Sequence, residues 1–369
     1  MPSTTIPVRT ASAVYDVEIA PDLLGSIGER LAALLPSKPR MFVVTSPEIW
    51  ALHGEAFAAS LPSEPTVLYV PSGEEHKRLA TVERLAEELA QHGADRDSVL
   101  IAFSGGVLGD MTGFLAAAYM RGIRYIQVPT TALAQIDSAL GGKTGVNLAA
   151  GKNLFGAFHH PLAVYADTAV LSTLPPAQLR AGLQESVKAG IIRDRALFDY
   201  LDEHHEAVLS GDVAALTHVI AASVQVKATV VAADEKESGE RMLLNLGHTL
   251  GHAIEAATNY NQLLHGEAIA WGMLAAIEIA HKRGLVTDDE AETMGRVIRM
   301  YGPLKPFTAD AATLVALTAK DKKNRSGARS YVLPVGIGDA IVVRNVSEAE
   351  LTVAAEGLLS LIRDTEVHA

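Results

Sequence analysis

The sequence predicts two domains, an α/β domain built on a parallel sheet and a mainly α-helical domain after it. The chain has 369 residues, which is more than one hydrophobic core usually organises. In the first half, short β-branched runs alternate with helical stretches, as in a parallel sheet covered by helices. The stiff break Leu174-Pro175-Pro176 then introduces long helical segments.

Five buried strands and two helices are expected in the first half. The strands are short runs rich in β-branched and apolar residues: Met41–Val44, Val67–Val70, Val99–Phe103, Tyr125–Val128 and Val164–Ala166. Apolar residues recur at helical spacing in Leu79–His92 and Gly109–Met120. In such a sheet, ligands bind where the strands end.

The second half is expected to be mainly helical. Its long helical segments are Ala177–Ile192, Val213–Ala233, Gly247–Ala257 and Gly266–Arg283. A late pair of runs, Ser330–Leu333 and Ala340–Val343, alternates like a small hairpin. The change in pattern predicts a boundary near residue 171, with domains over 1–171 and 172–369.

Composition and charge exclude several classes of protein. Hydrophobic residues make up 49% of the chain and charged residues 20%, which argues against wholesale disorder. The formal net charge is −12 and no Lys/Arg-rich stretch occurs, which argues against nucleic-acid binding. The start of the chain lacks a signal-peptide pattern, and the apolar run Ala268–Ala280 is too short to span a bilayer. We therefore expect a soluble, cytoplasmic protein.

Histidines and a carboxylate in the second half suggest a metal site. The chain has no cysteine, so a metal must be held by His, Asp, Glu and water. His248 and His252 are four residues apart and would share one helix face. His265 stands beside a glycine at an expected helix start, and Glu185 lies in an earlier expected helix. Two histidines and one carboxylate are a common catalytic zinc set, but spacing leaves open which histidine is a ligand and which carries protons.

Two loops after expected strands are candidates for binding a nucleotide. Ser104–Asp110 is glycine-rich and opens a helix, where free backbone N–H groups and the helix dipole favour a pyrophosphate. Ser72–Lys77 mixes a turn glycine with carboxylates and a lysine, which could meet ribose hydroxyls and phosphate. The alternatives, a packing turn and a charged surface loop, stay open for each loop alone. Their shared position at successive strand ends favours cofactor binding.

Basic residues near these segments would suit an anionic substrate. They stand beside glycines in loops, or near the histidines, at Lys143, Lys152, Lys227, Arg241, Lys322 and Lys323. Each one alone is typical of a solvated surface charge. An anion that binds to so acidic a protein requires a local basic pocket. The basic residues taken together therefore indicate an anion-binding site better than any one of them does.

Long motifs in this chain resemble the 3-dehydroquinate synthase family of sugar phosphate cyclases. The matching stretches are GGVLGDMTGF, YMRGIRYIQVPTTALAQIDSALGGKTGVN, GKNLFGAFHHP, QESVKAGI, RMLLNLGHTLGHAIE and LLHGEAIAWGM. They run in family order from about residue 67 to residue 335. The resemblance implies a Rossmann-like NAD-binding domain followed by a helical metal- and substrate-binding domain, with the nicotinamide and the metal in one cavity between them.

The resemblance also implies roles for particular residues. Glu185, His248 and His265 match the metal ligands, for Zn²⁺ or Co²⁺, and His252 matches a histidine that handles protons. The substrate shell is matched at Asp137, Lys143, Asn153, Lys188, Lys227, Arg241, Asn245 and Lys322, with the choice between Lys322 and Lys323 left open. Arg121 resembles an arginine that reaches the neighbouring subunit's substrate phosphate, which implies a homodimer.

NAD contacts are implied along four stretches of the first domain. Combined with the two candidate loops, the expected cofactor-binding residues are Ser72, Gly73, Glu74, Glu75, His76, Lys77, Gly106, Val107, Leu108, Gly109, Asp110, Thr130, Thr131, Lys143, Lys152, Leu171, Ser172 and Thr173.

The reaction implied is conversion of 3-deoxy-D-arabino-heptulosonate 7-phosphate to 3-dehydroquinate and phosphate, a step of aromatic amino acid biosynthesis in the shikimate pathway. NAD first accepts a hydride and, as NADH, later returns it; phosphate is eliminated between these steps, and an intramolecular aldol step closes the ring.

Two other enzymes are alternatives: a valiolone- or inosose-type sugar phosphate cyclase, and a metal-dependent NAD polyol dehydrogenase. A carboxylate-binding pair, Lys227 and Arg241, argues against the former, and absence of net NADH release would exclude the latter. A protein that has lost activity is a further alternative, which the complete ligand set argues against.

Overall fold

The computed structural model describes residues 3–35, 37–319 and 330–367, with side chains described as far as residue 363. The chain divides into two compact units. Unit 1 contains residues 1–175 and 211–235, and unit 2 contains residues 176–210 and 236–369. The chain therefore leaves unit 1, returns to it for one helix, and leaves it again.

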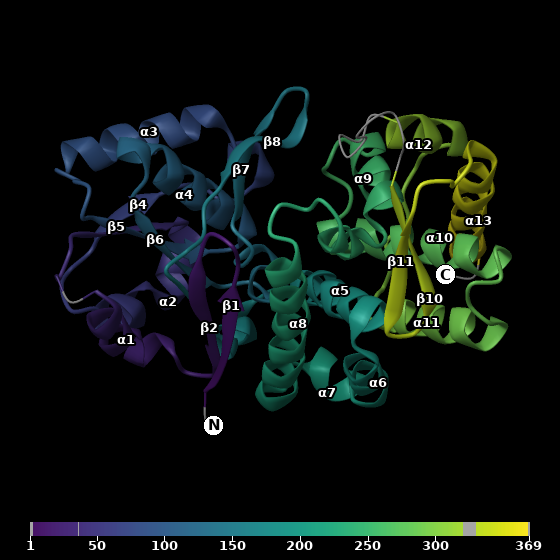
Figure 1. Ribbon diagram of the computed structural model, residues 1–369, viewed down its shortest axis with the longest axis horizontal. Helices are drawn as coiled ribbons and strands as arrows, with labels where there is room; N and C mark the ends of the chain where they lie inside the picture. The colour runs from purple at the N-terminus through teal and green to yellow at the C-terminus, as the bar shows by residue number, and fades with distance from the viewer. Residues whose placement is uncertain (1–2, 36, 320–329, 368–369) are drawn as a thin grey trace. The chain divides into compact units, whose positions relative to one another are not determined.

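Unit 1 is built on a seven-stranded sheet (Figure 1). In spatial order the strands are β1 (Thr4–Arg9), β2 (Val14–Ala20), β9 (Ala163–Asp167), β6 (Arg124–Pro129), β5 (Val99–Ser104), β3 (Met41–Thr45) and β4 (Thr66–Tyr69). β1 pairs antiparallel with β2, and all other neighbours are parallel. β3, β4, β5, β6 and β9 confirm the five expected strands to within one residue at each end.

The two faces of this sheet are covered by different helices. Along β3, Phe42 and Val44 face one core, whereas Met41 and Val43 face the other, because successive strand residues point to opposite faces. The first core contains residues of α3 (Leu79–Gln91) and α4 (Gly106–Ala118), and the second contains residues of α1 (Ile27–Leu34) and α2 (Pro47–Ser60). Burial on both faces explains why the central strands are continuously apolar.

Helix α8 (Val213–Ala233) completes unit 1, although it lies well beyond residue 171 in the sequence. It contacts β1 and β2 (Figure 1). The sequence-based division assigned this stretch to the second domain, because an apolar helical pattern gives the length of a helix but not its packing partner. Among the described residues, α8 is the one helix long and apolar enough to cross a membrane, and 56% of its most apolar window is buried in the fold, as in the core helix of a folded domain.

A hairpin of β7 (Lys143–Leu148) and β8 (Gly151–Phe158) extends from unit 1 as a separate two-stranded sheet (Figure 1). Short helical turns precede or follow several of the parallel strands: η1 (Leu24–Ser26), η2 (Glu74–His76), η3 (Tyr119–Arg121), η4 (Ala134–Ser138) and η5 (Thr168–Thr173). The hairpin was not expected from the sequence, because its glycines and polar residues are typical of loops.

The described residues of unit 2 are helical apart from one hairpin, as expected. Its helices are α5 (Pro176–Arg193), α6 (Arg195–Glu203), α7 (His205–Ser210), η6 (Glu240–Asn245), α9 (His248–Ala257), α10 (His265–Lys282), α11 (Asp288–Met300), α12 (Ala311–Thr318) and α13 (Glu348–Val367). The hairpin consists of β10 (Tyr331–Gly336) and β11 (Asp339–Val343). α10 contacts α5, α9, α11 and α13, so its sequence is apolar nearly all round.

Candidate functional site

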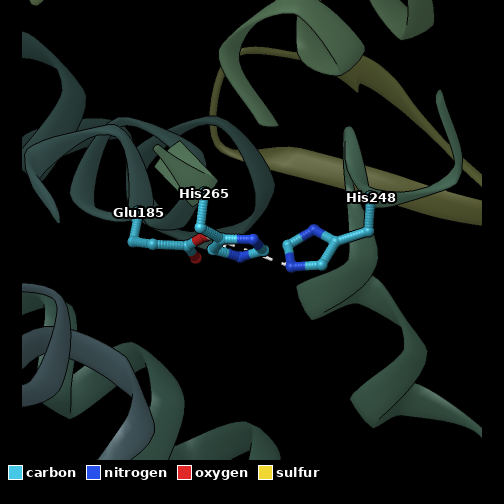
Figure 2. Close-up of side chains that lie close together, drawn as sticks. All are labelled: Glu185, His248 and His265. Carbon is cyan, nitrogen blue, oxygen red and sulfur yellow. Dashed lines mark ion pairs between the residues drawn. The ribbon is translucent and has the colours of Figure 1, made fainter. Parts of the chain in front are cut away.

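Three side chains from three helices of unit 2 converge on one point (Figure 2). Glu185 comes from α5, His248 begins α9, and His265 begins α10. One donor atom from each lies within 4.8 Å of the other two. The Nε2 atoms of His248 and His265 lie 4.0 Å and 3.8 Å from Oε1 of Glu185.

Glycines bring these helices together. A Cβ atom on Gly266 would lie 1.8 Å from the carbonyl oxygen of Ala181, so α10 approaches α5 closely one residue after His265. A Cβ atom on Gly272 would lie 1.9 Å from the carbonyl oxygen of Gly247, which brings α10 equally close to the start of α9. Only a residue without a side chain permits such contacts. The small residues around the histidines therefore determine where the histidines meet.

The carboxylate of Glu185 is buried and partly satisfied. Its side chain is 2% exposed, and Lys188 on the same helix donates to Oε2. Oε1 has no hydrogen-bond partner. A buried carboxylate oxygen without a partner is costly, because burial removes the water that would solvate its charge. Oε1 is also the oxygen that faces both histidines.

The distances fit a cation better than direct hydrogen bonds. Separations of 3.8 Å and 4.0 Å exceed the 2.7–3.2 Å range of N–H···O hydrogen bonds. Ligands of a tetrahedral zinc ion at about 2.0–2.2 Å lie about 3.3 Å apart, so a small contraction would suffice. These residues therefore fit a divalent cation with two imidazoles and one carboxylate.

Each histidine is oriented by a hydrogen bond at its other nitrogen. Nδ1 of His248 lies 3.1 Å from the carbonyl oxygen of Leu246, and Nδ1 of His265 lies 3.3 Å from Oε2 of Glu255. Such contacts fix the tautomer that leaves Nε2 available to a metal. Sequence reasoning did not single out Glu255. Its only signal was a carboxylate three residues after His252 on the histidine helix.

His252 lies beside the cluster but outside its first set of donors. Its ring centroid is 5.2 Å from that of His248 and 6.0 Å from that of His265. With Glu255 and His265 it forms a second group of close donor atoms. The geometry thus separates the histidines that spacing could not distinguish: His248 and His265 face Glu185, whereas His252 does not belong to that set.

In unit 1 the glycine loop follows β5 and opens α4, as expected. A Cβ atom on Gly109 would lie 3.0 Å from Oε1 of Gln127 on β6, and one on Gly106 would lie 2.5 Å from Oγ of Ser138. The side chain of Leu108 lies in the core beneath α3 and α4, with Val107 packed against it. The loop therefore packs the helix against its neighbours, and its place at the start of α4 is compatible with backbone contacts to an anion.

Lys77 connects the second loop to the first. Its Nζ donates to Oδ2 of Asp110 at 2.7 Å and to Oδ1 of Asn153 at 2.6 Å. Burial raises the pKa of the Asp110 carboxyl, and the neighbouring Lys77 ammonium opposes that rise. Glu74 accepts a hydrogen bond from Asn147 at 2.6 Å, so it too is held by the β7–β8 hairpin.

The other expected cofactor-binding residues lie at strand ends of unit 1. Thr130 and Thr131 follow β6, and the hydroxyl of Thr130 is buried without a partner. Leu171 is buried in η5, where Thr173 bonds to His53 at 2.8 Å. The remaining members lie in the β4–η2 loop, in η2, in η5 or on β8: Ser72, Gly73, Glu75, His76, Ser172 and Lys152.

The residues expected around a substrate are divided between the units. In unit 1, Lys227 on α8 donates to the carbonyl oxygen and Oδ1 of Asp137, both at 2.7 Å. Lys143 is exposed at the start of β7, and Arg121 is exposed at the end of η3 with a φ of 69°.

In unit 2 the expected substrate residues lie close to the histidine segment. Arg241 is 1% exposed, and Lys188 is paired with Glu185. Nδ2 of Asn245 donates to Oε1 of Glu237 at 2.7 Å, a carboxylate that sequence reasoning missed. Lys322 and Lys323 lie outside the described residues.

Comparison with known proteins assigns the chain to a family. Residues 67–181 match the family model described as 3-dehydroquinate synthase N-terminal, and residues 182–324 match 3-dehydroquinate synthase C-terminal. The chain is 48% identical to a 3-dehydroquinate synthase of Solibacter usitatus (strain Ellin6076), over 94% of this chain and 97% of that protein.

Solved structures with the same fold include sugar phosphate cyclases. A 2-epi-5-epi-valiolone synthase from Streptomyces hygroscopicus subsp. jinggangensis 5008, with NAD⁺ and Zn²⁺ bound, has a TM-score of 0.87 and 31% identity and covers 94% of this chain and 97% of its own. A 2-deoxy-scyllo-inosose synthase complexed with carbaglucose-6-phosphate, NAD⁺ and Co²⁺ has a TM-score of 0.86 and 28% identity, covering 96% and 100%. The sequence and structural matches agree on the expected fold, and the chain belongs to the 3-dehydroquinate synthase family.

Proposed function

We propose that the chain has the activity for which its family is named. It converts 3-deoxy-D-arabino-heptulosonate 7-phosphate to 3-dehydroquinate and phosphate in the shikimate pathway, as a carbon–oxygen lyase of the cytoplasm. The observation that carries this proposal is the set of Glu185, His248 and His265, whose donor atoms converge as a catalytic divalent cation requires.

The cofactors are NAD and Zn²⁺ or Co²⁺, held by different units. Glu185, His248 and His265 hold the metal, and the loops after β4, β5 and β6 bind NAD. When bound, NAD accepts and returns a hydride, and the cation lowers the pKa of hydroxyls that it binds.

The basic residues bind the two anionic ends of the substrate. Arg241 and Lys227 hold the carboxylate, because a guanidinium can donate two parallel hydrogen bonds to it. The phosphate is held by a lysine–asparagine set consisting of Lys143, Asn153, Asn245 and Lys322. His252 moves protons, since it lies beside the metal ligands without joining them. Lys188 and Asp137 orient the reacting centre through the charged partners that they contact, Glu185 and Lys227.

Product analysis tests the activity directly. The protein is supplied with the heptulosonate phosphate, catalytic NAD and a divalent metal, and phosphate and dehydroquinate are measured. We expect equal amounts of both products and no net NADH, because the cofactor is regenerated in each cycle. Net NADH would instead indicate a polyol dehydrogenase, and the absence of any product would contradict the proposal.

Arg241 separates this activity from that of related cyclases. A seven-carbon ketose phosphate that lacks the carboxylate leaves Arg241 and Lys227 without their ligand. We expect turnover of that compound to be weak, and Arg241→Ala to raise the KM for the heptulosonate phosphate more than it lowers kcat. Faster turnover of the compound without a carboxylate would favour a valiolone-type cyclase.

The functional form is proposed to be a homodimer in which Arg121 contacts the neighbouring subunit's substrate phosphate. The exposed position of Arg121 at the end of η3 supports this assignment. Arg121→Ala and His252→Ala variants, each inactive alone, should regain activity when mixed and allowed to exchange subunits. No recovery despite proven exchange would place Arg121 in its own subunit's site.

A further inference from the structure

The base of the β7–β8 hairpin is held by a polar cluster of Ser12, His160 and Glu235, in which the side chains of His160 and Glu235 are largely buried. The hairpin carries Lys143 and Asn153, both assigned to the substrate phosphate under the proposed function. Gly141 and Gly142 lead into it, and His159 and His160 follow it. The backbone N–H of His159 donates to the carbonyl oxygen of Gly142 at 2.8 Å, which closes the base.

The two glycines before the hairpin contact Tyr15 and His160. The N–H of Gly141 donates to the hydroxyl of Tyr15 at 2.9 Å. Gly142 has a φ of +70°, and a Cβ atom there would lie 2.8 Å from the ring of His160. The rings of Tyr15 and His160 are 5.6 Å apart. A displaced His160 ring would therefore free the residue that directly precedes Lys143.

His160 is in turn held by Glu235, just beyond the end of α8. Nε2 of His160 lies 3.1 Å from Oε1 of Glu235, and the two side chains are 6% and 9% exposed. Ser12, between β1 and β2, donates its hydroxyl to Oε1 and its N–H to Oε2 of the same carboxylate. The hydroxyl of Ser12, and then His160, lower the pKa of the Glu235 carboxyl, so the acceptor is ionised at neutral pH.

Residues on or next to helix α8 thus contact the chain both before and after the hairpin. Lys227 fixes Asp137, a few residues before Gly141, and Glu235 fixes His160 after the hairpin. Both anchors are on or next to one helix, so the positions of the two hairpin ends are coupled. Farther along, β7 packs on α4 and Asn147 pairs with the segment around Lys77, so the base is the anchor nearest to Lys143.

We propose that Ser12, Glu235 and His160 are positioning residues that hold the hairpin base and thereby place Lys143 and Asn153 for the substrate phosphate. This role rests on the proposed function. None of the three touches the reacting atoms. They act through Gly142, because the His160 ring occupies the space that a side chain there would need. Loose placement of a binding residue is costly, since a misplacement of about 1 Å can reduce a rate about 100-fold.

The test compares His160→Ala, His160→Gln and Glu235→Gln with a matched control. Asp288→Asn is the control, because Asp288 also pairs with a histidine, His281, but on the exposed surface of unit 2. We expect His160→Ala to lower kcat/KM about tenfold, mainly through a higher KM for the heptulosonate phosphate, with little change in melting temperature. His160→Gln should recover most of the loss, because its amide can still donate to Glu235.

Hydrogen exchange gives a readout that does not depend on turnover. Amides of residues 143–158 should exchange faster in His160→Ala and Glu235→Gln, whereas amides of β5 and α4 should be unchanged. Unaltered exchange across the hairpin would overturn the proposal, and so would a lower melting temperature with an unchanged KM, which is the signature of a purely structural cluster. If the wild-type chain forms no dehydroquinate, the proposed function fails, while the exchange experiment still decides whether the cluster holds the hairpin.

Discussion

The two units present their candidate sites in different ways. In unit 2, the donors of the metal cluster are side chains at the starts or in the middle of three closely packed helices. In unit 1, the expected nucleotide contacts lie in loops at strand ends, where backbone groups are the available partners and side chains such as Leu108 belong to the core. A side-chain site leaves a pattern of residue types in the sequence, whereas a backbone site leaves mainly glycines.

The charges at the two sites differ as well. Lys77 and Asp110 in unit 1 form an ion pair, so each has a partner of opposite charge. Lys188 in unit 2 contacts only one oxygen of Glu185, and the other oxygen faces two imidazoles without a partner. The unpartnered oxygen of Glu185 in unit 2 therefore fits a cation, whereas the Lys77–Asp110 pair in unit 1 is balanced without one.

Loss of a histidine ligand should have the largest effect and should be confined to unit 2. We expect His248→Ala to weaken metal binding by more than about 100-fold, because even the partners of metal ligands contribute 10–100-fold. Metal content after dialysis and NAD affinity by calorimetry check this. His281→Ala, which removes an exposed histidine of the same unit, is the control. Normal metal content in His248→Ala would remove His248 from the ligand set.

A substitution at Gly266 tests whether helix packing builds the metal site. Gly266→Ala places a methyl group against the carbonyl oxygen of Ala181, so α5 and α10 must separate. We expect a stability loss of about 1–3 kcal/mol, together with weaker metal binding, since Glu185 and His265 move apart. Gly25→Ala is the control, because a Cβ atom there meets nothing within 4 Å. Thermal unfolding and metal titration measure the two effects, and retention of both wild-type values would show that the helices need not be so close.

The partner of His265 should contribute less than a ligand itself. Glu255→Gln keeps the size of the side chain but removes the charge that orients the His265 imidazole. We expect metal affinity to fall about 10–100-fold while the fold is retained. A competition assay with a chelator measures the change. An affinity equal to that of the wild type would mean that the Glu255 contact has no influence on the metal.

The sequence predicted the helices and strands of the fold better than it predicted which of them pack together. The central strands were found because burial on both faces makes them continuously apolar, and the long helices were found from their spacing. β1 and β2 were missed, since only alternate residues such as Ile6 and Val8 are buried. The bounds of α8 were predicted correctly, but the helix was assigned to the second domain and lies in unit 1. Its apolar residues do not specify which surface they cover.

The site was predictable where chemistry depends on unusual residue types. Paired histidines stand out in an alanine-rich helix, and the family resemblance supplied Glu185 as their partner. Glu237 and Glu255 were missed, because a glutamate in or near a helix is usually a surface residue and only the fold shows which atoms it meets. The cluster around Glu235 was missed for the same reason.

The smallest expected effect is a change in thermal stability at low pH, because buried or paired carboxyls in the two units have pKa values shifted in opposite directions. Glu350 in unit 2 is bonded to Arg283, whose guanidinium lowers the pKa of that carboxyl to about 2. A carboxyl with a lowered pKa stabilises the fold above its ordinary value of 4.5, and this contribution is lost as pH falls toward 2. The buried aspartates of unit 1, Asp110 and Asp167, behave oppositely, because burial raises their pKa.

Glu350→Gln should therefore lower the melting temperature at neutral pH only slightly, by about 1 °C, because the side chain of Glu350 is 34% exposed and water screens the pair to about 0.5 kcal/mol. The difference from the wild type should shrink as the pH is lowered from 4.5 toward 2. Calorimetric scans at several pH values measure it, with Glu55→Gln, at an exposed position on α2 in unit 1, as the control. A difference that grows in acid would have the wrong sign for a carboxyl whose pKa is lowered in the fold.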